Sequence, residues 1–186
     1  MFELFVERIA SGLQIRLILW KSSRLTFRSS MIASMIKSAF AAAPSTSLVE
    51  LVKGPHTSDE TIEIAKAFAV NTGKSPIVIQ KEIPGFVANR INAAVTHEAL
   101  SLLEKGIATV EDIDTACEKG LNYPMGPFKL MDLTGIDVYY YVRCDRYAES
   151  HDPFDAPHPL AVEKFKKGEF GRKTGKGWYD YTDTKK

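Results

Sequence analysis

One glycine-rich segment could bind phosphate: Gly171-Arg172-Lys173-Thr174-Gly175-Lys176-Gly177. A Walker A loop needs four residues between its glycines, followed by Gly-Lys and then Ser or Thr. Here only three residues intervene, Gly177 follows the lysine, and no helical pattern comes next. We therefore interpret the segment as an ordered Gly-rich tail. No GxGxxG follows a predicted strand, so the dinucleotide-binding fingerprint is missing from these 186 residues.

The cysteines and histidines show no spacing typical of metal sites. Cys117 and Cys144 lie 27 positions apart without a CxxC, and the four histidines form no H-x3-H or HExxH pattern. We therefore predict neither a metal site nor a disulfide framework, and a reducing compartment is the default. His97 falls inside a predicted helix, where a packed histidine is the favoured interpretation over a catalytic one.

Composition excludes several classes of protein. Apolar residues make up 45% of the chain and charged residues 25%, which is typical of globular domains. The net charge of +1 gives no electrostatic case for binding nucleic acid. No stretch approaches the ~18 apolar residues that a spanning helix needs, so we expect no membrane partner.

Residues 1–47 differ from the rest of the chain. From Arg8 to Val49 there are six basic residues, nine serines and no acidic residue. This composition fits a mitochondrial transit peptide, an unspecified N-terminal segment, or a start altered by a shifted frame or gene boundary. Glu3 and Glu7 lie where a transit peptide avoids acid, which favours the cytoplasm, with the mitochondrial matrix as the alternative. We predict an irregular, basic, Ser-rich segment ending at residue 47.

From residue 48 onward the local patterns agree with one another. Short strands are predicted at 48–52 and 76–80. A capping box of Thr57 and Glu60 opens a helix to about residue 72. A longer helix, 86–105, is expected to bury the face that carries Val87, Ile91, Ala94, Val95, Leu102 and Leu103. Further helices are predicted at 109–120, 128–133, 136–148 and 160–167, so the fold class is mainly α with short strand remnants at its N-terminal edge.

Four strings in this order carry a resemblance to a known family: Leu48-Val49-Glu50-Leu51-Val52-Lys53-Gly54, Pro84-Gly85-Phe86-Val87-Ala88-Asn89-Arg90-Ile91, Asn122-Tyr123-Pro124-Met125-Gly126-Pro127-Phe128 and Phe170-Gly171-Arg172-Lys173-Thr174-Gly175-Lys176-Gly177-Trp178-Tyr179. The region 48–181 resembles the C-terminal half of the 3-hydroxyacyl-CoA dehydrogenases, which include 3-hydroxybutyryl-CoA dehydrogenases. The resemblance implies an all-helical C-terminal domain that forms a dimer, preceded in the full-length family by a Rossmann domain that binds NAD. It also implies oxidation of the 3-hydroxyl of a 3-hydroxyacyl-CoA, in fatty-acid or butyrate metabolism.

The resemblance implies roles for two residues. Glu50 matches the glutamate that orients the family's catalytic histidine, and Asn89 matches the asparagine that hydrogen-bonds the substrate oxygen. The competing interpretations are a solvated strand-end carboxylate and a helix-surface amide. The histidine itself lies twelve residues before the glutamate in the family, and Ser38 stands there in this chain. His56 is close in sequence to Glu50 but falls in the turn before a helix, so we do not expect it to replace the base.

These residues predict a chain that is inactive or severely impaired alone. The catalytic histidine and the NAD-binding motif are missing, so no NAD is expected to bind this chain by itself. We interpret residues 48–186 as the C-terminal helical domain of a dehydrogenase acting on a 3-hydroxyacyl-CoA, with a homodimer as its assembly. Two alternatives stay open: a non-enzymatic helical dimerisation module, and one half of a split enzyme whose NAD-binding half is a separate polypeptide.

Overall fold

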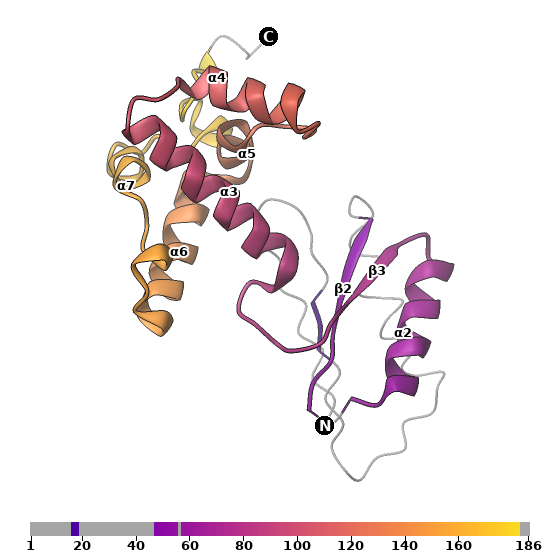
Figure 1. Ribbon diagram of the computed structural model, residues 1–186. Coiled ribbons are helices and arrows are strands. Elements are labelled where there is room, and N and C mark those ends of the chain that lie inside the picture. Colours follow the sequence, from indigo (N-terminus) through magenta and orange to yellow (C-terminus); the bar gives the residue numbers. More distant parts are fainter. Residues whose placement is uncertain (1–15, 19–46, 56, 183–186) are drawn as a thin grey trace. The chain divides into compact units, whose positions relative to one another are not determined.

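The computed structural model describes residues 16–18, 47–55 and 57–182, which form two compact units divided between Val87 and Ala88 (Figure 1). The first unit contains β1 (Arg16–Ile18), β2 (Leu48–Val52), α2 (Asp59–Asn71) and β3 (Ser75–Ile79). The second contains most of α3 (Phe86–Glu104), then α4 (Val110–Thr115), η1 (Ala116–Gly120), α5 (Pro127–Thr134), α6 (Ile136–Ser150), η2 (Pro153–Asp155), α7 (Pro159–Lys166) and η3 (Arg172–Thr174). The predicted mainly-α fold with short strands before the helical part is confirmed.

The first unit is built on a parallel sheet with the strand order β1-β2-β3. The central strand β2 buries Val49, Leu51 and Val52, as expected for a parallel strand covered on both faces. Two adjacent parallel strands need a crossover connection, and α2 is that connection between β2 and β3. The helix contacts both strands, and its buried residues are Ile62, Ala65 and Ala69. The segment β2-α2-β3 is therefore a βαβ unit.

Two local predictions in this unit need correction. The N-cap of α2 is Ser58, whose hydroxyl accepts from the Thr61 amide (3.2 Å), so the predicted capping box of Thr57 and Glu60 is wrong. The Thr57 hydroxyl instead accepts from the Gly54 amide (3.1 Å), because it closes the turn that precedes the helix. The second predicted strand is shifted by one residue, since β3 begins at Ser75.

Strand β1 lies inside the segment that the sequence predicted to be irregular. Its three residues pair in register with the end of β2, Arg16 opposite Glu50 and Ile18 opposite Val52. This pairing could not be predicted, because a strand of three residues has too few positions to show a period. The predicted character of the rest of residues 1–47 falls almost entirely outside the described residues.

The second unit has one apolar core, made by Ala99, Leu100, Ile113, Phe128, Met131, Ile136 and Ala161. Helix α3 contributes Ala99 and Leu100 to it, with Leu102 and Leu103 packed against its edge. The predicted core face of α3 is wrong over its first half, where Val87, Ile91 and Ala94 are exposed. Apolar residues occur on more than one side of this helix, so periodicity alone could not select the buried side.

Local capping signals mark the helix ends in this unit. The Thr109 hydroxyl accepts from the Asp112 amide (3.1 Å) at the start of α4, and Pro127 occupies the first turn of α5. The first amides of α5 have no acceptor within the helix and bind a residue from an earlier helix. The buried Asp114 carboxylate of α4 accepts from the Phe128 and Lys129 amides (2.9 and 3.0 Å). Among the described helices, none is long and apolar enough to cross a membrane.

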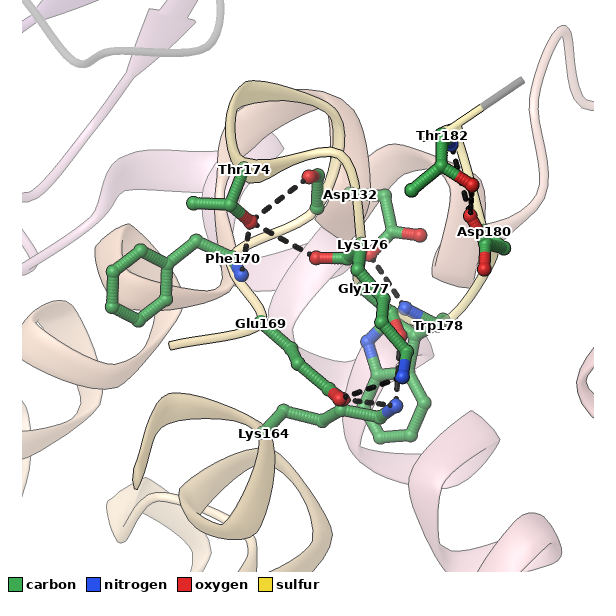
Figure 2. Close-up of polar contacts among 11 residues, drawn as sticks. Asp132, Lys164, Glu169, Phe170, Thr174, Lys176, Gly177, Trp178, Asp180 and Thr182 are labelled. Atoms are coloured by element: carbon green, nitrogen blue, oxygen red, sulfur yellow. Dashed lines mark hydrogen bonds and ion pairs between the residues drawn. The ribbon is translucent and has the colours of Figure 1, made fainter. Parts of the chain in front are cut away.

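The C-terminal tail, residues 168–182, is folded onto α5 and α7 (Figure 2). Asp132 is 1% exposed and accepts from the amides of Trp178 and Tyr179 (both 2.9 Å) and from the Tyr181 hydroxyl (3.0 Å). Lys164 donates to Glu169 and to the Gly177 carbonyl oxygen, both at 2.8 Å. Burial raises the pKa of Asp132 and raises that of Tyr181 to about 12. The Gly-rich segment is thus a structural element rather than a phosphate loop.

Candidate functional site

Glu50 occupies the middle of β2 and is 4% exposed. Its backbone lies in register between Arg16 of β1 and Ile77 of β3. A buried carboxylate costs free energy unless hydrogen bonds or opposite charges compensate for its lost hydration. The alternative of a solvated strand-end carboxylate therefore does not describe this residue.

The Val87 backbone amide donates to Glu50 Oε1 at 3.0 Å. This amide is in the first turn of α3, where backbone N–H groups have no acceptor within the helix. Glu50 thus caps α3 from 37 positions earlier in the chain. This contact has no local signal in the sequence, because a capping pattern spans about four residues and this acceptor comes from another element.

The two predicted site residues lie in different units. Glu50 belongs to the first unit, whereas Asn89 is a partly buried residue in the first turn of α3 within the second. Ser38 and His56 lie outside the described residues, so the absence of a base at either position stays a prediction. The structure therefore shows how Glu50 is buried and hydrogen-bonded, whereas the role of Asn89 rests on the family resemblance.

The described residues do not fit the pyrophosphate of a dinucleotide. A dinucleotide-binding turn uses several glycines and a helix N-terminus whose amides face the phosphates. Between β2 and α2 there is one glycine, Gly54, and the first turn of α2 carries Asp59 and Glu60, whose charges repel phosphate. Lys53, which precedes Gly54, pairs with Asp59 at 2.5 Å, so the positive charge of Lys53 is compensated within the chain. Among the described residues, no group of three or more His, Cys, Asp or Glu side chains could hold a metal ion.

A pair of histidines packs together in the second unit. The half-buried His97 ring lies 4.7 Å from the Phe154 ring and 6.2 Å from the His158 ring. His158 is buried, its Nδ1 accepts from the Leu160 amide (3.4 Å) at the start of α7, and its Nε2 lies 3.6 Å from Glu104 Oε2. This packing agrees with the interpretation of His97 as a packed histidine.

Burial of His158 makes stability depend on pH. Desolvation lowers the pKa of His158 below its ordinary 6.5, although Glu104 opposes the shift. As pH falls below 6.5, the unfolded chain takes up the proton first, so we expect the second unit to lose stability there and not above it. His158→Asn keeps a capping acceptor and removes the titration, so it should flatten this loss in urea unfolding between about pH 7.5 and 5.5.

The matched control for this prediction is His151→Asn. His151 is exposed and adopts a left-handed conformation (φ 54°) after α6, which asparagine tolerates. We expect this variant to keep the wild-type pH slope. Equal slopes in wild type and His158→Asn would contradict the assignment to His158.

Comparison with known proteins identifies the family. Residues 85–181, more than half of the chain, match the family described as "3-hydroxyacyl-CoA dehydrogenase, C-terminal domain". The chain belongs to the 3-hydroxyacyl-CoA dehydrogenase family. Residues 33–83 match "3-hydroxyacyl-CoA dehydrogenase, NAD binding domain". The boundary predicted after residue 47 falls inside this second match, and the residues of β2, α2 and β3 match the NAD-binding domain.

Individual 3-hydroxyacyl-CoA dehydrogenases show the extent of the similarity. A mitochondrial hydroxyacyl-coenzyme A dehydrogenase from Sus scrofa is 41% identical over 144 residues, which is 76% of this chain and 45% of the relative. A 3-hydroxybutyryl-CoA dehydrogenase from Bradyrhizobium diazoefficiens is 37% identical over 142 residues, 76% of this chain and 48% of the relative. The crystal structure of (S)-3-hydroxybutyryl-CoA dehydrogenase from Ralstonia eutropha has a TM-score of 0.67 at 41% identity, covering 75% of this chain and 49% of that one. The chain spans about half the length of the curated relatives that it matches.

Proposed function

We propose that this chain is part of an NAD-dependent dehydrogenase that oxidises the 3-hydroxyl of a 3-hydroxyacyl-CoA to a ketone. Family membership supports the reaction class, and the buried Glu50 carboxylate held by the Val87 amide is the observation that carries the proposal. Glu50 holds the catalytic histidine in one tautomer and stabilises the positive charge that it gains. Asn89 donates a hydrogen bond to the substrate oxygen, where negative charge develops.

We further propose that the chain does not turn over substrate alone. Ser38 stands at the family's histidine position, and a serine hydroxyl cannot serve as a base of useful pKa. These 186 residues also contain no GxGxxG after a strand. One alternative is a split enzyme, in which the histidine and the NAD-binding glycines lie on a second polypeptide. The alternative function is a non-enzymatic helical dimerisation module, and Ser38 favours it because a chain without the histidine lacks the catalytic base.

The test is NADH formation from 3-hydroxybutyryl-CoA. We expect no activity from the chain alone and measurable activity when an NAD-binding half with GxGxxG and the His-Phe-Phe-Asn-Pro string is added. Glu50→Gln should lower the activity of the mixture by about 10²-fold or more, because the glutamine cannot stabilise the imidazolium.

The control for this assay is Glu63→Gln, which changes an exposed carboxylate on α2 that pairs with Lys66 (2.8 Å). It should leave the activity of the mixture unchanged. NADH formation by the chain alone would contradict the need for a second half. A folded but inactive mixture would contradict the dehydrogenase proposal and support the dimerisation module.

We also propose a homodimer formed through the second unit. Ile91 on α3 is 59% exposed, and Tyr141 and Val142 on α6 are 58% and 42% exposed, so apolar side chains on two helices lack cover within one copy. Light scattering at micromolar concentration should give twice the chain mass of 20.7 kDa. Ile91→Glu should give the monomer mass, whereas Ile64→Glu, at an equally exposed position on α2, should leave the dimer intact. A wild-type monomer at high concentration would exclude this assembly.

For the compartment, we propose the cytoplasm, with the mitochondrial matrix as the alternative. The free cysteines Cys117 and Cys144 fit a reducing compartment. The relatives of this chain include a mitochondrial protein from Sus scrofa, which supports the alternative.

A further inference from the structure

The chain enters α3 through a tight turn at residues 83–86. The Phe86 amide donates to the Ile83 carbonyl oxygen (3.2 Å), and Gly85 between them has φ 78°. Proline followed by a glycine with positive φ is the pattern of a type II turn, in which a residue with a side chain at the glycine position is strained. The sequence Pro84-Gly85 thus sets the direction from which α3 begins.

Phe86 itself has an unusual backbone. Its φ is 49°, in the left-handed region that a bulky side chain rarely adopts. Its ring is 6% exposed and belongs to a small core cluster with Val52 of β2 and Ile79 of β3. Backbone strain of this kind persists when surrounding packing holds it, so the buried ring anchors the left-handed conformation.

The next residue delivers the contact to Glu50. The Val87 amide, directly after Phe86, donates to Glu50 Oε1 at 3.0 Å. The direction of that N–H is set by the backbone of Phe86, because one peptide plane joins the two residues. A carboxylate with one oxygen held by a fixed amide can no longer rotate freely about its last torsion.

We propose that Phe86 is a positioning residue for Glu50: its anchored left-handed backbone aims the Val87 amide at Oε1 and so fixes the plane of the carboxylate. This inference rests on the proposed function in one respect: the role of Glu50, which is to hold a histidine in one orientation, comes from that proposal. The contact itself is independent of that purpose. Phe86 need not touch substrate or cofactor, since it acts through the Val87 amide.

The experiment measures hydrogen exchange of the Val87 amide in the ¹⁵N-labelled full chain, as a ratio to exchange of the Leu51 amide in β2. Phe86→Ala should raise this ratio about tenfold, the effect of losing one hydrogen bond to a charged acceptor. Phe86→Leu, which keeps an apolar anchor, should restore most of the protection. Ile79→Ala is the matched control, because it opens the same cluster without touching the turn, and it should change both amides together.

The chemical shift of the Val87 amide proton gives a second readout. If Phe86 only stabilised the fold, Phe86→Ala would not reproduce the shift caused by Glu50→Gln. Glu50→Gln should shift the Val87 amide proton resonance upfield, since an amide oxygen is the weaker acceptor, and Phe86→Ala should shift the same resonance in the same direction. If Phe86→Ala changes the exchange ratio and the resonance no more than Ile79→Ala does, the proposal is wrong. Neither measurement needs substrate or NAD, so failure here is distinct from failure of the dehydrogenase assay.

Discussion

Replacing Asp132 by alanine is expected to lower the free energy of unfolding of the second unit by about 4 kcal/mol. The carboxylate accepts three hydrogen bonds from the tail, two from the Trp178 and Tyr179 amides and one from the Tyr181 hydroxyl. Alanine leaves these donors without an acceptor in a buried position, and each such loss costs about 1–3 kcal/mol. Urea unfolding followed by circular dichroism measures the change.

Two further substitutions separate the role of Asp132 from a general effect on the tail. Asp132→Asn keeps one oxygen acceptor and the side-chain shape, so it should lose less stability than alanine. Asp180→Ala removes an exposed tail carboxylate that accepts from the amide and hydroxyl of Thr182, two residues later, and should leave the unfolding midpoint unchanged. If Asp132→Ala unfolds at the same urea concentration as Asp180→Ala, then Asp132 does not hold the tail.

Gly171→Ala is expected to be as damaging, at about 4 kcal/mol, for a steric reason. Gly171 has φ 94°, and a Cβ placed there would lie 2.3 Å from the Asp132 carbonyl oxygen and 2.5 Å from its Cα. The clash is with backbone rather than with a flexible side chain, so the tail must move away from α5 to relieve it. Near-ultraviolet circular dichroism of the tail aromatic residues, together with thermal unfolding, reports this displacement.

Gly120→Ala is the matched control for this change. Nothing lies within 4 Å of a Cβ built at Gly120, and its φ is not in the left-handed region. The midpoint should stay the same or rise slightly, because alanine restricts the unfolded chain more than glycine does. Equal destabilisation by both substitutions would contradict the steric explanation.

Local patterns predicted most of the elements correctly. The strand at 48–52 and the helices predicted at 109–120 and 128–133 each depend on residues within a few positions of one another. Such signals are visible in a sequence because the interactions that they describe form within one turn or one strand. The family resemblance was visible for the same reason, as four short strings in order.

The buried side of α3 was not predicted correctly, although the helix itself was. Ile91 was expected in the core and is exposed, while Thr96 is buried. With apolar residues on several sides of the helix, the neighbouring helices decide which side is covered. The prediction of the α2 cap was wrong for a related reason. The hydroxyls of Thr57 and Ser58 are adjacent, and Ser58 caps the helix because Thr57 accepts a hydrogen bond in the preceding turn.

The sequence by itself therefore determined the family, the helical class, most helix boundaries and the two residues, Glu50 and Asn89, for which the resemblance implies a role. Only the tertiary structure showed that Glu50 is buried and held by the Val87 amide, 37 positions away. It also showed that Asp132 holds the tail by accepting from the Trp178 amide, 46 positions later. These contacts join side chains to backbone amides of distant elements. Every residue except proline supplies such an amide, so the donor cannot be recognised in the sequence. The contact forms only once packing brings the elements together.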